Sequence, residues 1–353
     1  MTNLEKYISI LEEGQGLLLT SAQSRYYAAQ FPISEGVAVV SKAGCRYFTD
    51  SRYIESAQNG IRGFQVVEMS RQNPYAMLIN SACADFGIQT LGYEEDYLTV
   101  AQFQGFAEKL DAQLTPMSSQ INSFRICKEA WELEIMRKAQ AITDEAFTQI
   151  LPCIHEGMTE KELTAELIYR LYRCGAEGLA FDPIVVSGPN TSMPHGVPGE
   201  RKLQAGDFIT MDFGAMYRGY CADMTRTVAL GYATEEMEQI YDTVLQAQLA
   251  GIAATKAGVT GEQVDGAARA VITEAGYGPY FGHGYGHSIG MECHEMPSVS
   301  PAGKNPIPAG AVCSAEPGIY LPGKFGVRIE DLVIFTDDGC ENITASPKEL
   351  IIL

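Results

Sequence analysis

Residues 281–297 read FGHGYGHSIGMECHEMP and include three of the five histidines in the chain, His283, His287 and His294. Glycines in this stretch allow positive φ and a close approach of the backbone to a ligand, at an entropic cost that a binding site justifies. One histidine alone is more often a hydrogen-bonded core residue than a functional one. Three histidines at spacings of four and seven indicate instead the lining of an active site. The same glycines argue against an ordinary helix or strand here.

Four acidic residues lie in two β-like segments that resemble each other. In residues 207–230, DFITMDFGAMYRGYCADMTRTVAL, Asp212 lies in an apolar run and Asp223 follows eleven residues later, after a glycine-containing turn. In residues 311–335, AVCSAEPGIYLPGKFGVRIEDLVIF, the corresponding places belong to Glu316 and Glu330. A carboxylate in apolar surroundings is costly to bury unless a cation or strong hydrogen bonds compensate it. Four such acids and a histidine therefore predict a metal site rather than four solvent-facing side chains.

The donor atoms of this set indicate which ions suit it. Oxygen-rich coordination with one imidazole fits divalent manganese, cobalt, iron or zinc, and manganese best fits the excess of carboxylates. Four carboxylates are enough to hold two ions. Two-metal sites acidify a shared water and polarise the carbonyl that it attacks. The expected reaction is a hydrolysis.

An internal repeat relates the two acidic segments. Four residues recur 101 positions later: Gly157, Thr159, Glu162 and Gly175 match Gly258, Thr260, Gln263 and Gly276. A threonine followed after three positions by Glu or Gln is a capping box, which begins a helix. Residues 205–212 also match residues 309–316, at an offset of 104. Two similar halves, each with two helices followed by strands, predict a pseudo-symmetric α+β domain whose antiparallel sheet is covered by helices on one face.

The first third of the chain has a different pattern. Strand-like runs at residues 17–20, 37–40 and 46–49 alternate with helical patterns up to about residue 114, which is typical of a small α/β domain. A polar segment at residues 118–124 then precedes a long amphipathic helix within residues 129–151. We therefore predict two domains, residues 1–122 and 123–353. The first lacks a catalytic cluster, and its expected role is substrate restriction or subunit contact.

Composition excludes several kinds of partner. The net charge is −19, with 44 acidic against 25 basic residues, so nucleic acids and anionic membranes are not expected to bind. The N-terminus lacks the pattern of a signal peptide, and no apolar run reaches eighteen residues. Nine cysteines occur singly, without a C-x-x-C pair, which favours a reduced cytoplasm and packing roles.

The motifs MDFGA, CADMTRT, GHSIGMECHE, AEPGIY and GVRIED resemble those of the pita-bread metallopeptidases, in particular the aminopeptidase P and prolidase branch. The resemblance covers essentially the whole chain, because that branch also has an N-terminal creatinase-like α/β domain of this size and a linker similar to residues 121–139. It implies a pita-bread catalytic domain and a homodimer. Creatinase-like relatives without metal lack this carboxylate set, and methionine aminopeptidases normally lack the N-terminal domain and the segment around His195.

By position, the resemblance also implies a role for each matching residue. Glu316 would accept the proton of the nucleophilic water, and His294 would stabilise the developing tetrahedral centre. His195, in residues 187–198, and His283 would line the substrate pocket on the proline side, and Arg328, beside the last ligand, would brace the site. The implied metal ligands are Asp212, Asp223, His287, Glu316 and Glu330.

The resemblance leads to one main functional prediction and to open alternatives. The chain is expected to be a metal-dependent Xaa-Pro aminopeptidase that acts on proline-containing peptides. The alternatives are an Xaa-Pro dipeptidase (prolidase) and a metal-free relative that only binds peptides. Ser288 departs from the family, which usually has glycine after the ligand histidine, and its hydroxymethyl group is expected to narrow the cleft.

Overall fold

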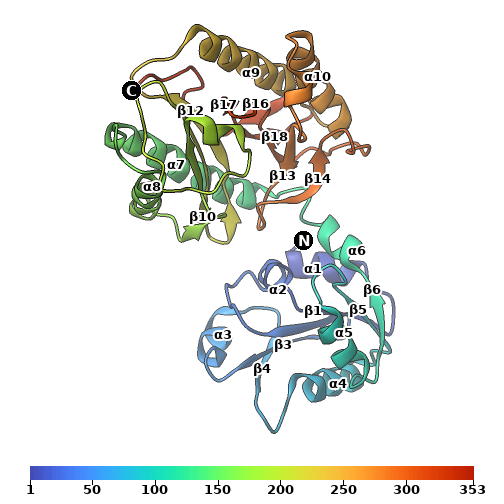
Figure 1. Cartoon of the computed structure of the whole chain (residues 1–353). Helices are drawn as coiled ribbons and strands as arrows, with labels where there is room; N and C mark the ends of the chain where they lie inside the picture. Colours follow the sequence, from blue (N-terminus) through green and yellow to red (C-terminus); the bar gives the residue numbers. More distant parts are fainter. The chain divides into compact units, whose positions relative to one another are not determined.

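The structure, a computed structural model, describes residues 1–353 and divides them into two units, Met1–Phe124 and Arg125–Leu353 (Figure 1). No helix in it combines the length and the apolar character needed to cross a bilayer.

The unit Met1–Phe124 is built on a mixed six-stranded sheet in the order β4-β3-β2-β1-β5-β6. Its strands are β1 (Gln15–Leu19), β2 (Val37–Ser41), β3 (Cys45–Asp50), β4 (Gln65–Met69), β5 (Thr90–Tyr93) and β6 (Gln113–Pro116). Its helices are α1 (Asn3–Ser9), α2 (Ala22–Ala29), α3 (Ile54–Gly60), α4 (Tyr75–Phe86), α5 (Val100–Ala107) and α6 (Ser118–Ser123). The central strand β1 pairs antiparallel with β2 and parallel with β5. The three predicted strands coincide with β1, β2 and β3 within two residues at each end.

Two pairs of helices accompany the strands of the unit Arg125–Leu353. The first pair is α7 (Ala130–Ile150) and α8 (Glu160–Cys174), and the second pair is α9 (Glu235–Ala254) and α10 (Gly261–Glu274). Three short 3-10 helices, η1 to η3, span Leu151–Cys153, Gly188–Ser192 and Gly278–Tyr280. Each pair packs against strands around an apolar core of its own. The pairs are visible as the green and the brown-orange helices in Figure 1.

The strands of this unit all pair antiparallel, as predicted, but they form several small sheets rather than one. The first half contributes β7 (Gly178–Leu179), β8 (Ile184–Ser187), β9 (Phe208–Phe213), β10 (Ala215–Tyr217), β11 (Tyr220–Cys221) and β12 (Met224–Ala229). The second half contributes β13 (Gly286–Ser288), β14 (Glu295–Val299), β15 (Val312–Ala315), β16 (Gly318–Leu321), β17 (Phe325–Arg328), β18 (Asp331–Phe335) and β19 (Cys340–Asn342). The sheet orders are β11-β10-β7, β12-β9-β8, β14-β13-β15-β18-β19 and β16-β17.

The internal repeat is visible in backbone hydrogen bonds. The N–H of Gly157 donates to the carbonyl of Leu203 at 2.9 Å, and 101 positions later the N–H of Gly258 donates to the carbonyl of Ile307 at 2.8 Å. The φ angles of the two glycines, 87° and 85°, lie in the left-handed region that favours glycine. Capping boxes begin both α8 and α10, as the sequence predicts.

The two halves meet along β12, β17 and β18. The carbonyl of Thr225 accepts the N–H of Glu330 at 3.1 Å, and the Thr225 hydroxyl donates to the carboxylate of Glu330 at 2.7 Å. Arg226 forms a buried ion pair with Asp331 at 2.8 Å. These contacts tie residues about one hundred positions apart into one scaffold, and the acidic residues of the predicted site lie along it.

The stretch 281–297 contains more regular structure than its glycines suggest. His287 lies in β13, and the pairing of β13 with β14 shifts register between His287 and Ser288. The glycines argued against an ordinary strand, and β13 is a short, irregular one in which glycine is needed for close packing. A Cβ atom at Gly286 would lie 2.1 Å from the carbonyl oxygen of Ser314.

Candidate metal centre

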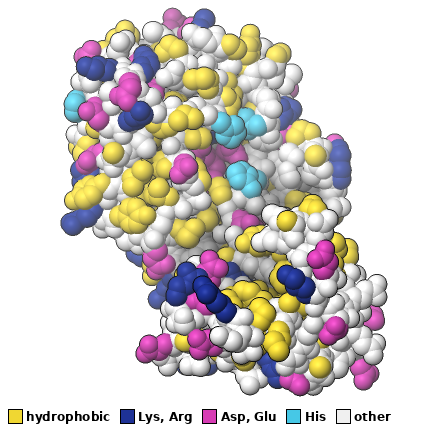
Figure 2. All heavy atoms as spheres, turned by 60° about the horizontal axis from the view of Figure 1, so that its bottom comes forward, with side chains coloured by type: hydrophobic (Ala, Val, Ile, Leu, Met, Phe, Trp, Pro, Cys, Tyr) yellow, Lys and Arg dark blue, Asp and Glu magenta, His cyan; other side chains and the backbone are white.

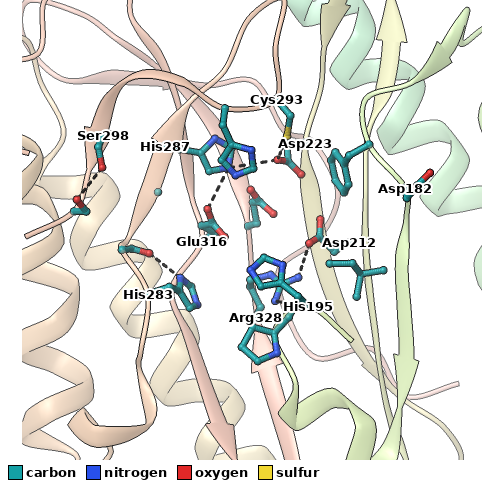
Figure 3. A pocket seen from close by; sticks show the side chains of 18 residues that line it. Asp182, His195, Asp212, Asp223, His283, His287, Cys293, Ser298, Glu316 and Arg328 are labelled. Carbon is teal, nitrogen blue, oxygen red and sulfur yellow. Dashed lines mark hydrogen bonds and ion pairs between the residues drawn. The ribbon is translucent and has the colours of Figure 1, made fainter. Parts of the chain in front are cut away.

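A cavity of about 440 Å³ in the unit Arg125–Leu353 brings together all the residues that the sequence predicts for the site. Figure 2 shows histidine side chains around acidic ones at a hollow on one face of the molecule. Figure 3 shows the cavity from close by. The predicted residues that line it are His195, Asp212, Asp223, His283, His287, His294, Glu316, Arg328 and Glu330.

Each half of the unit supplies two of the four carboxylates, from equivalent places. Asp212 lies in β9, and Glu316 directly follows β15. Asp223 directly precedes β12, and Glu330 directly precedes β18. His287, in β13, adds one imidazole from the second half. The pseudo-symmetry of the fold is therefore what gathers the acids.

Three carboxylate oxygens of this group are buried without a hydrogen-bond partner. They are Oδ1 of Asp212, Oδ1 of Asp223 and Oε1 of Glu330. Asp223 and Glu330 are only 4% and 1% exposed. Burial raises the pKa of both carboxyls, and the charges of the neighbouring carboxylates raise each pKa further. Burial also raises the pKa of Glu316. Ionising several buried carboxyl groups so close together is unfavourable unless a cation compensates their charges.

The ring of His287 faces the carboxylates with a nitrogen that carries no proton. Its Nδ1 lies 3.2 Å from the carbonyl of Ser288, which only accepts hydrogen bonds, so we assign the proton to Nδ1. Burial lowers the pKa of this imidazole, which favours its neutral form. Its Nε2 lies 3.3 Å from Glu316 Oε1 and 3.6 Å from Asp223 Oδ2. A lone pair directed at two carboxylates is the arrangement of a metal ligand.

These donors fit a divalent cation. One ligand atom each from Asp223, His287 and Glu330 lie within 4.8 Å of one another. A cation among them would satisfy the carboxylates of Asp223 and Glu330 and the Nε2 of His287 together. Carboxylates with an imidazole form the kind of donor set that binds hard or borderline divalent ions.

A chain of hydrogen bonds supports the opposite wall of the cavity. Arg328 is ion-paired with Asp212, and its Nη1 donates to the Tyr320 hydroxyl at 3.0 Å. That hydroxyl lies 2.9 Å from Nε2 of His283, whose Nδ1 lies 2.8 Å from the carbonyl of Gly284. Burial lowers the pKa of His283. Both of its nitrogens thus have hydrogen-bond partners in the protein. A substrate in the cavity would meet the face of the ring and not a free donor or acceptor.

The remaining two predicted histidines are more exposed. The ring of His294 lies against that of His287, with centroids 4.0 Å apart and the rings tilted by 36°, and partial burial and the neighbouring His287 lower its pKa. His195 lies in the loop after η2 and lines the same cavity. These rings therefore border the carboxylate cluster from the accessible side.

Ser288 does not narrow the cleft, contrary to the expectation from its sequence. It is fully buried, and its hydroxyl donates to the carbonyl of Val312 at 2.9 Å. Strand alternation explains the difference: His287 points into the cavity, so the next residue points to the other face of the sheet. The serine is therefore a structural residue of the sheet.

Sequence reasoning missed several residues that shape the site. Tyr320 is the last residue of the motif AEPGIY, and this position could have indicated that it belongs to the site. Ser314, whose hydroxyl donates to Glu316 at 3.1 Å, lies two residues before that acid in a strand and so on the same face. Cys293 was assigned to packing, but it lines the cavity and its thiol donates to Asp223 Oδ2 at 3.4 Å.

Comparison with known proteins identifies the class to which this fold and site belong. Residues 134–337 match Metallopeptidase family M24, and residues 9–127 match the Creatinase/Prolidase N-terminal domain. The chain therefore belongs to metallopeptidase family M24, and its enzymatic nature and the predicted pita-bread architecture are confirmed. Membership of this family implies divalent metal ions.

Particular relatives are similar over nearly their whole length. The chain is 39% identical to the uncharacterized peptidase YqhT of Bacillus subtilis, over 96% of each chain. Among solved structures, it is 42% identical to an Xaa-Pro dipeptidase from Bacillus anthracis, with a TM-score of 0.96 and 99% of each chain covered. It is 35% identical to an X-Pro aminopeptidase from Thermotoga maritima, with a TM-score of 0.93 and 99% of each chain covered. The predicted resemblance is thereby confirmed.

The raised carboxyl pKa values predict how the stability of the metal-free protein depends on pH. In the unfolded chain the same carboxyls titrate near their usual values, about 3.9 for Asp and about 4.3 for Glu. Above that range the unfolded state has released protons that folded Asp223, Glu316 and Glu330 retain. Stability therefore falls as the pH rises from about 4 through the raised folded pKa values.

The urea midpoint measured between pH 5 and 8 checks this prediction. The metal-loaded protein is the control. Its ligand carboxyls are already deprotonated, so they should not lower its stability as the pH rises. Asp331, whose pKa is lowered mainly by Arg226 and Lys348 despite burial, contributes equally in both forms. Parallel pH profiles for the two forms would contradict the prediction.

Proposed function

We propose that this chain is an Xaa-Pro peptidase that hydrolyses the bond between an N-terminal residue and a following proline. The observation that carries the proposal is the convergence of His287 Nε2 and three unpartnered carboxylate oxygens in an accessible cavity of an M24 chain. The substrate class is supported by relatives and solved neighbours described as Xaa-Pro dipeptidases and X-Pro aminopeptidases.

We assign the roles of the site residues as follows. Two divalent ions bound here would acidify a water and polarise the scissile carbonyl. Glu316 accepts the proton of the attacking water, and His294 donates a hydrogen bond to the developing tetrahedral centre. Arg328 orients Asp212 and, through Tyr320, His283. His195 and His283 contact the proline side of the substrate. The ligands are Asp212, Asp223, His287, Glu316 and Glu330.

Manganese is the ion that we assign to this centre. The set contains four carboxylates and one imidazole, and such oxygen-rich sites suit manganese better than softer ions. We also propose a cytoplasmic location, which the nine unpaired cysteines support, and a homodimer, which rests on the family resemblance alone. Residues 1–122 would restrict the substrate or contact another subunit, and residues 123–353 would carry the catalysis.

Substrates longer than a dipeptide are favoured by the shape of the cleft. A second cavity of about 500 Å³ shares Pro194, His195 and His283 with the first, and it is extended by residues such as Tyr280. In this proposal, the second cavity would hold the residues that follow the proline. Arg328 is the sole Lys or Arg side chain among the residues lining either cavity, and it is committed to Asp212. No other cation there is placed to hold the carboxylate of a dipeptide.

A dipeptidase remains the second candidate, because the solved neighbour from Bacillus anthracis is described as one. A series of Ala-Pro, Ala-Pro-Ala and a longer Ala-Pro peptide separates the two. Higher kcat/KM for the longer peptides supports the aminopeptidase, and cleavage confined to Ala-Pro supports the dipeptidase.

Proline specificity is a direct prediction of the proposal. An Xaa-Pro bond lacks an N–H, and its ring fixes φ, so a cleft built for it recognises the shape of the ring. Ala-Pro-Ala should therefore be cleaved at least about tenfold faster than Ala-Ala-Ala, which corresponds to the about 1–3 kcal/mol that apolar pocket contacts provide. Initial rates on the two peptides measure this. Equal rates would reject the proline assignment and leave a general aminopeptidase.

His294→Ala should lower activity without removing the metal. The ring borders the carboxylate cluster but is not one of the proposed ligands, so elemental analysis should find the parent metal content. Loss of a single transition-state hydrogen bond typically lowers kcat by about 10²- to 10³-fold. His155→Ala, which replaces an exposed histidine outside both cavities, is the control. A His294→Ala variant as active as the parent would show that the role belongs to another residue.

A further inference from the structure

Cys293 brings a thiol into the candidate metal centre. Its side chain lines the cavity, and its Sγ lies 3.4 Å from Oδ2 of Asp223, the carboxylate whose other oxygen is buried without a partner. It directly precedes His294 and follows the turn after β13. The proposed hydrolysis gives this thiol no task.

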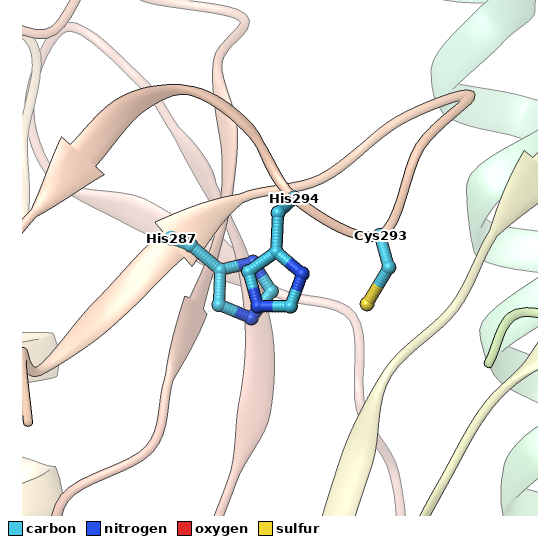
Figure 4. A group of neighbouring side chains, drawn as sticks. All are labelled: His287, Cys293 and His294. Atoms are coloured by element: carbon cyan, nitrogen blue, oxygen red, sulfur yellow. The ribbon is translucent and has the colours of Figure 1, made fainter. Parts of the chain in front are cut away.

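Three donors meet at this point. Sγ of Cys293 and one ring nitrogen each of His287 and His294 lie within 4.8 Å of one another (Figure 4). Tetrahedral zinc has Zn–S and Zn–N lengths of about 2.3 and 2.0 Å, which place two nitrogen donors roughly 3.3 Å apart and a sulfur and a nitrogen donor roughly 3.5 Å apart. Small rotations of these side chains are therefore enough to close the set around one ion. Asp223 lies close enough to complete the coordination.

The turn that carries two of these donors is held in place. Glu295 accepts the N–H groups of Met291 and Glu292 at 3.0 and 3.2 Å. The ammonium group of Lys128, which is almost fully buried, donates to the same carboxylate at 3.2 Å. Cys293 and His294 are thus presented from a braced turn rather than from a free loop.

We propose that Cys293, His287 and His294 form a second, thiolate-containing donor set that binds a thiophilic divalent cation of the zinc or cadmium kind. The thiol releases its proton to solvent as the metal–sulfur bond forms. Soft thiolate ligands select such ions, whereas the carboxylates select harder ions such as manganese. Because His287 belongs to both sets, a thiophilic ion competes with the ion of the carboxylate set and also occupies His294. Its binding inhibits the peptidase, and this consequence rests on the proposed function.

Cadmium binding to the whole, metal-stripped chain tests the site without any peptide. The first equivalent of Cd²⁺ should produce the ultraviolet absorption of a cadmium–thiolate bond. Cys293→Ser and Cys293→Val should both lack that absorption and bind Cd²⁺ at least about tenfold more weakly, since even a residue that only supports a ligand typically contributes about 10- to 100-fold to metal affinity. Cys153→Ser, which removes a half-buried thiol that lines neither cavity, should behave as the parent.

Mn²⁺ binding shows whether Cys293 is a metal ligand or only supports the structure of the site. Cys293→Ser should weaken Cd²⁺ binding much more than Mn²⁺ binding. Equal losses for the two ions, or an unchanged cadmium–thiolate absorption in the variant, would overturn the proposal. If the Mn²⁺-loaded parent cleaves no Xaa-Pro peptide while the metal-stripped parent shows the absorption with Cd²⁺, the proposed function fails and this site stands. If the parent cleaves the peptide but shows no cadmium–thiolate absorption, this site is rejected and the proposed function stands.

Discussion

Removal of divalent ions should abolish peptidase activity completely. Without a cation, the cavity holds four carboxyl groups, three of them with raised pKa values, and the imidazole of His287, and none of these supplies a nucleophile for a peptide bond. The measurement is the initial rate on an Xaa-Pro peptide after chelation, with elemental analysis of the same sample. Added Mn²⁺ should restore more activity than Co²⁺ or Zn²⁺.

Glu330→Gln provides the corresponding test within the chain. The variant keeps the size of the side chain but removes a buried charge whose Oε1 has no partner in the protein. Metal content and activity should fall together. Glu262→Gln is the matched control, because it removes the same charge from an exposed ion pair with Lys304. Full activity in protein shown to be free of metal would reject the metal centre.

The repeat explains why so much of the site could be predicted from the sequence. Thr159 and Thr260 begin equivalent helices, and Asp212 and Glu316 lie at equivalent strand ends. Helix caps, glycines with positive φ and acids in apolar runs can each be recognised from a short segment of the sequence. Once two such segments repeat, their symmetric association places the acids together.

Other features of the site depend on contacts that no short window contains. The hydrogen bond between Cys293 and Asp223 joins residues 70 positions apart, and a single cysteine in a chain of scattered cysteines gives no signal of it. The occupation of Nε2 of His283 depends on Tyr320, which reaches it from β16. The burial of Ser288 depends on which face of β13 turns to the cavity. Only the assembled sheets determine these points.

Glu316→Gln should reduce kcat by about 10²- to 10⁴-fold, the usual contribution of a positioned general base. Oε1 of Glu316 accepts the Ser314 hydroxyl at 3.1 Å and lies 3.3 Å from His287 Nε2, so the side chain is fixed between a strand and the imidazole. Glutamine keeps this shape and still accepts the hydroxyl through its amide oxygen. It loses the negative charge and the capacity to take a proton from water.

Because Glu316 is also a proposed ligand, the two roles must be separated by metal concentration. We expect the glutamine variant to bind its ions more weakly but to fill with excess Mn²⁺, since Asp212, Asp223, His287 and Glu330 remain. Excess Mn²⁺ fills the site and so compensates for the lost ligand. It does not replace the lost proton acceptor, so kcat should stay low. His294→Ala, by contrast, should hold its metal at ordinary concentrations. A glutamine variant that regains the parent kcat in excess Mn²⁺ would show that Glu316 acts only as a ligand and that another group accepts the proton.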